Sequence, residues 1–390
     1  MYRMALDMSQ AAPENVIYID DRKMFVQVAG ELGIHGIHHT GFESTKQALA
    51  EFGLELRDSE MQKSSTVKSM SGEGYDIGIV GLGVMGRNFA WNIADHGFRV
   101  AGYDRKAKKA KSLEEGTEGD KSEGYTSFDD FLEALKKPRS ILLLVPAGGP
   151  VDEVIDKLTP MLGKEDLIID GGNSNFKDTN RHFEELASKG IHFMGVGISG
   201  GAHGARHGPS IMPGGPKEAY QRVAPILEAV AADADGEPCV AYLGPKSAGH
   251  YVKMVHNGIE YGLMQLLAET YDILKRVMGY DNDRMADIFE KFNNGIVESY
   301  LVEITARILR QPDEKSGNRV IDMILDAAKQ KGTGKWMSQD SMELQSPDPV
   351  IDAAVGARDL SGIYRERSAA SEILKGPEPT SAKIDESFVE

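Results

Sequence analysis

The chain has 390 residues, of which 41% are hydrophobic and 27% charged, a composition typical of a globular protein with two or three domains. Its net charge of -16 argues against a nucleic acid or a membrane surface as a partner, because both attract basic proteins. The single cysteine, Cys239, excludes an intramolecular disulfide, and neither a transmembrane run nor a signal-peptide core is found. We therefore expect a cytoplasmic protein.

The first 57 residues predict a small βαβα segment that is too short to form a doubly wound domain. An acidic pair, Asp20-Asp21, follows the first strand. It resembles the C-terminal end of a haloacid-dehalogenase-type phosphatase, where such a pair helps to hold Mg²⁺. That family's nucleophile motif, DxD after an earlier strand, is missing, so we expect a remnant without phosphatase activity. Clustered histidines at 35, 38 and 39 are interpreted as incidental, and no metal site is expected.

A dinucleotide-binding domain is predicted after a linker at 58–74, which is rich in Ser, Lys and Gly. An apolar strand at 76–80 runs into the turn Gly81-Leu82-Gly83-Val84-Met85-Gly86, and a helix follows. The next strand ends in Asp104. In this context a GxGxxG indicates a dinucleotide site, since its glycines permit the turn, the approach of a pyrophosphate and close packing of helix on strand. The helix N-terminus then faces the phosphates.

Three further strands are expected at 141–145, 167–170 and 192–196, and each runs into a loop of small residues. Ligands of open α/β sheets bind beyond the carboxyl ends of the strands, where these loops lie. Past Gly249, helical periodicity dominates to about Ser371. The predicted fold is thus a βα fragment at 1–57, an α/β Rossmann-type domain at 75–250 and an all-α domain at 251–390.

A polar stripe marks the start of the helical region. Five side chains fall at i, i+3, i+4, i+7 and i+8 on one helix face: Lys253, His256, Asn257, Glu260 and Tyr261. Such varied groups beside apolar neighbours favour a cleft wall, with a solvated face as the alternative. Lys253 and Glu260 are about 10 Å apart along the helix axis, a span suited to the two ends of a short acid. A structural ion pair is the alternative. As a base, Lys253 needs a lowered pKa.

Together these motifs resemble the 6-phosphogluconate dehydrogenase family, and the resemblance covers residues 75 to about 377. The matching stretches are GLGVMGRN, LLLVPAGGPVD, IIDGGNS, GISGGAHGARHGPSIMPGG, GHYVKMVHNGIEYG, EITARIL and QKGTGKW. The resemblance implies oxidative decarboxylation of 6-phosphogluconate to ribulose 5-phosphate and CO₂ with reduction of NADP, a step of the pentose phosphate pathway and of gluconate utilization. An NAD-dependent 3-hydroxyacid dehydrogenase of the same superfamily and an inactive nucleotide-binding fragment are the alternatives.

The resemblance also implies roles for individual residues. Lys253 is the expected base, which later acts as the acid that polarises the ketone, and Glu260 is expected to protonate the enediol. The implied substrate-binding residues are Asn173, Ser199, Gly200, Gly201, His256, Asn257, Tyr261, Lys331 and Arg358. The implied cofactor-binding residues are Gly81, Gly83, Val84, Met85, Gly86, Asp104, Arg105, Lys106, Val145, Ala147 and Asn173.

The chain departs from the family in two places. Asp104-Arg105-Lys106 stands where Asn-Arg-Thr is common. An aspartate there favours the ribose diol of NAD, whereas Arg105, Lys106 and Lys109 can hold the 2′-phosphate of NADP, and we expect NADP. The chain also stops at Glu390, while the family's helical domain continues. We therefore expect an incomplete helical domain, and a homodimer for the full-length protein.

Overall fold

The computed structural model describes residues 12–20, 22–52, 74–116 and 121–376, and the chain divides into two compact units, Met1–Lys68 and Ser69–Glu390. Asp21 of the predicted acidic pair and most of the predicted linker lie outside the described residues. In the small unit the Asp20 carboxylate accepts hydrogen bonds from the Tyr18 hydroxyl and the Arg22 backbone. Its elements are η1 (Pro13–Asn15), β1 (Ile17–Asp20), α2 (Lys23–Glu31), β2 (His35–His38) and α3 (Phe42–Ala50), with β1 and β2 parallel.

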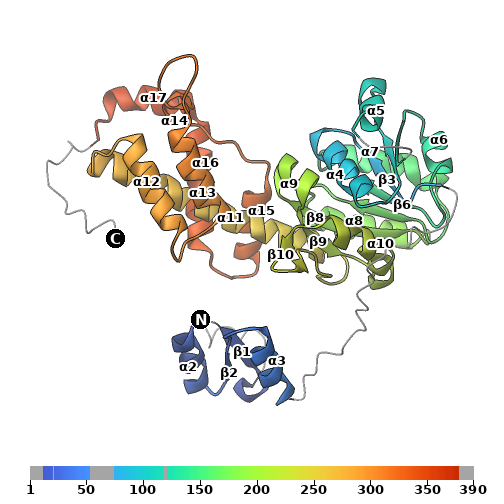
Figure 1. Ribbon diagram of the computed structural model, residues 1–390, viewed down its shortest axis with the longest axis horizontal. Coiled ribbons are helices and arrows are strands. Elements are labelled where there is room, and N and C mark those ends of the chain that lie inside the picture. Colours follow the sequence, from blue (N-terminus) through green and yellow to red (C-terminus); the bar gives the residue numbers. More distant parts are fainter. Residues whose placement is uncertain (1–11, 21, 53–73, 117–120, 377–390) are drawn as a thin grey trace. The chain divides into compact units, whose positions relative to one another are not determined.

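The larger unit contains a sheet flanked by helices (Figure 1). The sheet has seven strands in the order β5-β4-β3-β6-β7-β8-β9. The first six strands are parallel, and their order reverses between β3 and β6, as in doubly wound dinucleotide-binding domains. This confirms the predicted Rossmann-type domain. β8 continues to Ser199, beyond the predicted end, because β9 pairs with it in antiparallel fashion. The strands are β3 (Ile77–Val80), β4 (Val100–Tyr103), β5 (Ser122–Tyr125), β6 (Ser140–Leu143), β7 (Leu167–Asp170), β8 (His192–Ser199) and β9 (Ser210–Gly214).

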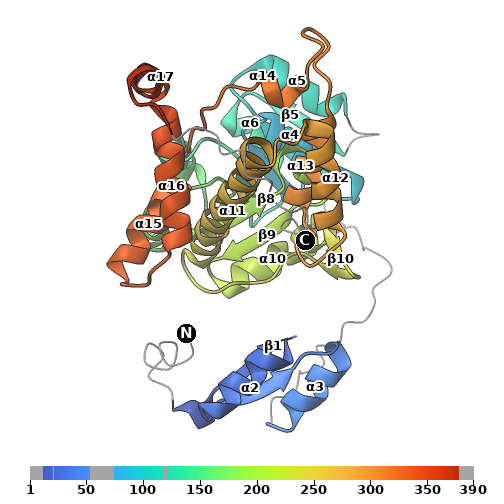
Figure 2. The same cartoon turned by 90° about the vertical axis from the view of Figure 1, so that its left-hand side faces the viewer.

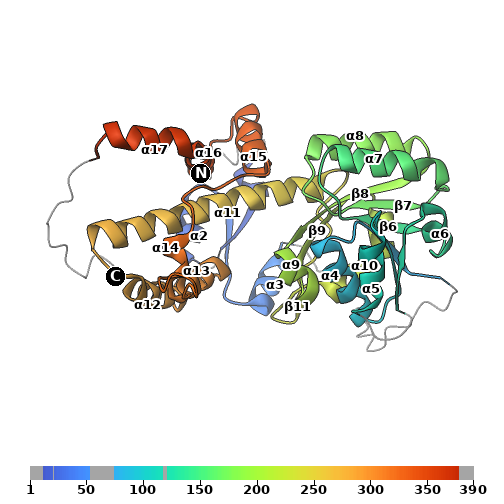
Figure 3. The same ribbon diagram turned by 90° about the horizontal axis from the view of Figure 1, so that it is seen from above.

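Helices cover both faces of this sheet (Figure 3). On one face Phe89 and Leu227 belong to a core with α4 (Val84–Asp95), α5 (Ala107–Glu114), α9 (Gly201–His207) and α10 (Lys217–Val230). On the other face Phe131 and Ile155 belong to a core with α6 (Phe128–Glu133), α7 (Gly149–Leu158) and α8 (Phe176–Ala187). Short elements complete the domain, namely η2 (Thr159–Met161) and the antiparallel pair β10 (Asp233–Ala234) and β11 (Glu237–Pro238).

An all-helical domain follows, as predicted. Its long helix α11 (Ala248–Asp272) lies between the α12–α13 pair and the α15–α16 pair (Figure 2). Met285, Phe289 and Leu309 form a small core between α12 and α13. The remaining elements are the π-helical turn η3 (Ile273–Val277), α12 (Asn282–Asn293), α13 (Tyr300–Arg310), α14 (Val320–Met323), α15 (Thr333–Glu343), α16 (Pro349–Gly362) and α17 (Tyr364–Ile373). In the described ranges, no helix has both the length and the apolar character needed to cross a membrane.

The first turn of α11 packs directly on the backbone of the sheet. A methyl group on Gly249 would lie 2.2 Å from the Met212 carbonyl oxygen and 2.3 Å from the Gly195 carbonyl oxygen. A methyl group on Gly214 would lie 2.3 Å from the Gly249 nitrogen. Only glycine permits backbones to approach this closely. The glycines therefore fix the position of α11 on β8 and β9.

Candidate active site

The turn between β3 and α4 gives each of its three glycines a different environment. Gly81 has a φ of +101°, and a methyl group there would lie 2.6 Å from the Leu144 carbonyl oxygen. A methyl group on Gly83 would have no neighbouring atom within 4 Å. On Gly86 it would lie 2.0 Å from the Gly81 carbonyl oxygen. These are the environments expected for the tight turn, the approach of a ligand and the packing of helix on strand.

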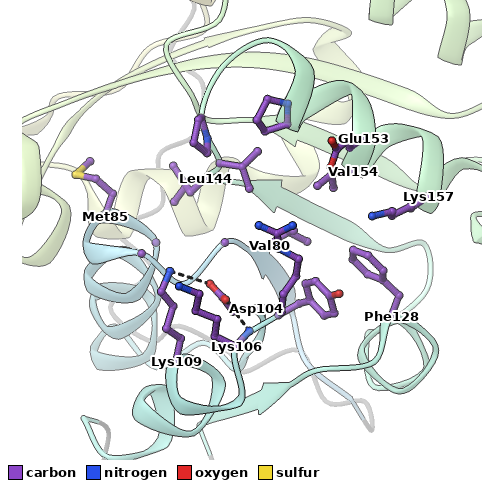
Figure 4. Close-up of a pocket in the computed structure, with 18 of the residues that line it drawn as sticks. Val80, Met85, Asp104, Lys106, Lys109, Phe128, Leu144, Glu153, Val154 and Lys157 are labelled. Carbon is purple, nitrogen blue, oxygen red and sulfur yellow. Dashed lines mark hydrogen bonds and ion pairs between the residues drawn. The ribbon is translucent and has the colours of Figure 1, made fainter. Parts of the chain in front are cut away.

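A cavity of about 700 Å³ lies beside this turn, at the carboxyl ends of β3, β4 and β6 (Figure 4). It lies at the point where the strand order reverses, which is where open α/β sheets bind nucleotides. Ala147 and Asn173 are not among its lining residues. Nine of the predicted cofactor-binding residues do line it: Gly81, Gly83, Val84, Met85, Gly86, Asp104, Arg105, Lys106 and Val145.

Sequence reasoning missed several residues on the opposite wall of the cavity. Phe128 stacks on Tyr103 with 3.8 Å between the ring centroids, and Glu153 and Lys157 of α7 line the same space. Tyr103 falls inside the predicted second strand, but nothing in the sequence distinguishes Lys157 from an ordinary surface lysine. Only the fold makes α7 and the end of β4 walls of the same cavity.

The Asp104 carboxylate is already engaged within the protein. Its two oxygens accept hydrogen bonds from the backbone N–H groups of Leu82, at 3.1 Å, and Lys106, at 3.0 Å. The Lys109 ammonium lies 3.3 Å away and forms a salt bridge with it (Figure 4). Asp104 thus ties the end of β4 to the glycine-rich turn, and its charge is partly neutralised. In the part of the chain that the structure describes, Arg105 and Lys106 form no side-chain salt bridge.

Lys253 is buried, with 6% of its surface exposed, against β8. A methyl group on Gly197 would lie 2.5 Å from the Lys253 Cβ, so glycine makes room for the lysine stem. Burial lowers the pKa of the Lys253 amine, and the negative charge of Glu260 opposes this effect. Among the described residues no salt bridge joins Lys253 to Glu260, whose carboxylate instead lies 3.4 Å from His256 Nδ1. The structure therefore does not contain the ion pair that was the alternative to a catalytic pair.

The next polar residues of α11, His256 and Asn257, are half-buried. His256 Nδ1 is 3.4 Å from the Asn257 side-chain oxygen. Farther along, the Arg358 guanidinium lies 4.0 Å from the centre of the Tyr261 ring. A methyl group on Gly334 would be 2.5 Å from that ring, which places the KGTGK turn beside Tyr261. Lys331 begins this turn and is exposed.

The loops after β7 and β8 contain the other predicted substrate-binding residues. Asp170 is buried at the end of β7, and its carboxylate accepts hydrogen bonds from Ser174 Oγ at 2.5 Å and from the Gly172 backbone at 2.9 Å. Asn173, between them, is exposed. Ser199, Gly200 and Gly201 follow Gly197 at the end of β8 and lead into α9. The structure thus brings Lys253 close to the β8 strand that leads into this loop.

Known proteins match both domains. Residues 76–244 match the NAD binding domain of 6-phosphogluconate dehydrogenase, and residues 249–390 match its C-terminal domain. The chain is 52% identical over 302 residues to the NADP(+)-dependent, decarboxylating 6-phosphogluconate dehydrogenase of Bacillus subtilis, which covers 77% of this chain and 64% of that relative. It is 49% identical over 309 residues to the NAD(+)-dependent, decarboxylating enzyme of the same organism, covering 79% and 66%.

A solved structure agrees with these matches. The Plasmodium falciparum 6-phosphogluconate dehydrogenase aligns with a TM-score of 0.76 and 41% identity, over 80% of this chain and 68% of that chain. The chain spans just under two thirds of the length of the two Bacillus relatives. Because relatives named for either cofactor match at nearly the same identity, identity alone does not choose between NADP and NAD. The chain belongs to the 6-phosphogluconate dehydrogenase family.

Proposed function

We propose that this chain performs the oxidative decarboxylation of 6-phosphogluconate to ribulose 5-phosphate and CO₂ with NADP as cofactor. The observation that supports this most directly is the buried Lys253 amine, whose lowered pKa suits a general base. It lies on one helix face with Glu260 and Tyr261, at the junction of the nucleotide-binding domain and the helical domain. The names of the matching relatives supply the substrate.

The cavity residues fit NADP. The backbone N–H groups at the start of α4 would hold the pyrophosphate, since a helix N-terminus favours anions and Gly83 leaves the backbone open. Arg105 and Lys106 would hold the 2′-phosphate through charge-assisted hydrogen bonds. The Asp104 charge would repel that phosphate weakly, because Lys109 and two N–H groups already compensate it. When bound, NADP would accept the hydride from C3 of the substrate.

The proton transfers would use two groups of α11. Neutral Lys253 would take the proton of the C3 hydroxyl, and its ammonium would then donate a hydrogen bond to the new ketone oxygen. That polarisation favours loss of CO₂ from the β-keto acid, because the electron pair of the breaking bond moves onto an enediol. Glu260 would protonate the enediol carbon. Such positioned transfers each contribute roughly 10²–10⁴-fold.

The remaining predicted residues would hold the substrate. His256 and Asn257 would bind its hydroxyl groups, and the phosphate would lie near Tyr261, Lys331 and Arg358. The cation–π contact of Arg358 with Tyr261 supports this, because it keeps a guanidinium beside the phenol. The acid end would contact the loops after β7 and β8, at Asn173, Ser199, Gly200 and Gly201.

We also propose that the protein self-associates. Ile259, Leu263 and Leu266 lie at i, i+4 and i+7 on α11, and each has about half of its surface exposed. Exposed apolar side chains in such a row favour a protein partner. Light scattering on the purified protein should give the mass of a dimer, and a monomer at micromolar concentration would reject this part of the proposal.

The test of the reaction is an assay of the purified chain with 6-phosphogluconate and NADP. We expect NADPH and CO₂ in equal amounts, and less product with NAD. Turnover of a short 3-hydroxy acid without response to 6-phosphogluconate would reassign the chain to the simpler dehydrogenases. Binding of NADP with no turnover of either substrate would leave only a nucleotide-binding role.

A further inference from the structure

A buried histidine joins three elements around the proposed base. His250 is 1% exposed in the first turn of α11. Its Nε2 lies 3.0 Å from the Asp170 carbonyl oxygen at the end of β7. Its Nδ1 lies 2.7 Å from the Thr179 hydroxyl oxygen on α8. One side chain therefore connects α11 to the strand and the helix that flank the β7 loop.

The hydrogen-bond partners assign the proton on the ring. Burial lowers the pKa of His250 and so favours the neutral ring; His182 of α8 reinforces this effect, whereas the Asp170 carboxylate and the backbone of Asp170 and Gly172 oppose it. A carbonyl oxygen can only accept, so Nε2 carries a hydrogen, and in the neutral ring Nδ1 then accepts from the Thr179 hydroxyl. The Asn175 carbonyl oxygen is a second acceptor, 3.1 Å from the Thr179 hydroxyl oxygen, and Nδ1 of the neutral ring is the nearer one at 2.7 Å.

His250 and Lys253 both lie on α11 and pack against the same strand, β8. A methyl group on Gly195 would be 2.8 Å from His250 Nδ1, and a methyl group on Gly197 would be 2.5 Å from Lys253 Cβ. Gly195 and Gly197 face the same side of β8, and residues three apart share a helix face. Any rotation or lift of α11 that broke the His250 hydrogen bonds would therefore displace Lys253 as well.

We propose that His250 is a positioning residue for Lys253. Its two hydrogen bonds fix the rotation and height of α11 over β8, and so keep the lysine amine in its buried place against the sheet. His250 has no predicted contact with substrate or cofactor, and acts only through the helix. The inference rests on the proposed role of Lys253 as the base.

Three substitutions separate the two hydrogen bonds. His250→Gln can keep a donor for the Asp170 carbonyl, His250→Asn can keep an acceptor for Thr179, and His250→Leu keeps neither. We expect His250→Leu to lower kcat on the order of 10²-fold, the loss that about 1 Å of misplacement causes, with little change in NADP affinity. The two amide variants should recover part of the loss. Ile155→Val, a core change on α7 that leaves both hydrogen-bond partners of His250 in place, is the control for an ordinary loss of stability.

A second measurement does not depend on turnover. Competitive acetylation across a pH series, read by mass spectrometry, reports when Lys253 becomes a neutral nucleophile, with the exposed Lys189 as the internal reference. Lys253 should react at higher pH in His250→Leu than in the parent, because water reaching the amine removes the effect of burial while Glu260 still favours the charged form. Thr179→Val should also raise the pH at which Lys253 reacts. This variant replaces His250→Leu in the test if His250→Leu does not fold.

The outcomes are distinct. Unchanged acetylation of Lys253 in folded His250→Leu or Thr179→Val protein would overturn the positioning role. The positioning role is also overturned if the control, Ile155→Val, loses kcat as strongly as His250→Leu does. If the acetylation shifts but neither parent nor variants oxidise 6-phosphogluconate, the positioning role stands and the proposed function fails.

Discussion

Arg105 provides a quantitative test of cofactor choice. Its side chain lines the cavity, and in the described residues it forms no salt bridge, so it is free to bind the 2′-phosphate that distinguishes NADP from NAD. A hydrogen bond to a charged group contributes about 1.5–3 kcal/mol. Arg105 is exposed, so water weakens the interaction and the lower value applies. Since about 1.4 kcal/mol is a factor of ten, Arg105→Ala should raise the Kd for NADP roughly tenfold.

The assay is calorimetric titration of the purified chain with NADP and with NAD. The Kd for NAD should stay almost unchanged, and the loss for NADP should shrink at high salt because the charges are screened. Lys108→Ala is the matched control, since Lys108 is an exposed cation in the first turn of α5, close to Arg105 in the sequence, and does not line the cavity. Equal weakening of NADP and NAD, or an equal loss in Lys108→Ala, would refute this account of the site.

The other predictions concern the base, the turn and the helix junction. Lys253→Met should abolish turnover but keep NADP affinity, and retained turnover would exclude Lys253 as the base. In the parent, kcat should rise with pH at a midpoint below that of an ordinary lysine amine, because burial lowers the pKa of the base. Gly86→Ala should destabilise the protein by about 1–3 kcal/mol in urea unfolding, because its methyl group would meet a backbone oxygen at 2.0 Å. Gly83→Ala should leave unfolding unchanged yet weaken NADP binding, and the opposite ranking would contradict the assigned glycine environments. Tyr251→Phe should lower the free energy of unfolding by about 1–3 kcal/mol, because the buried Asp340 carboxylate loses the Tyr251 hydroxyl that donates to it at 2.5 Å. An unchanged denaturant midpoint would argue against that hydrogen bond.

The glycine-rich turn was predictable because its determinants are local. Gly81, Gly83 and Gly86 are within six residues of one another, between an apolar strand and an amphipathic helix, so spacing alone indicates the geometry. The polar stripe on α11 was predictable for the same reason. Side chains at helical spacing share a face whatever the rest of the fold does.

Other features depend on contacts between distant segments. β5 contains Ser-Glu-Gly-Tyr, which has no clear alternation, and it becomes a strand through its pairing with β4. β9 contains Pro213, which a sequence pattern reads as a strand breaker but which an edge strand tolerates. The hydrogen bond between Thr179 and His250 spans 71 positions in the sequence. No local pattern contains such a pair.

The glycine contacts at the start of α11 have a mechanical consequence. Where backbone touches backbone, as at Gly249 against Met212 and Gly214, no soft side-chain layer can deform. We therefore infer that the first turn of α11 moves together with the sheet. A hinge between the two domains is not expected at Gly249. The proposed base on α11 would then keep a fixed position relative to the sheet that carries the nucleotide site.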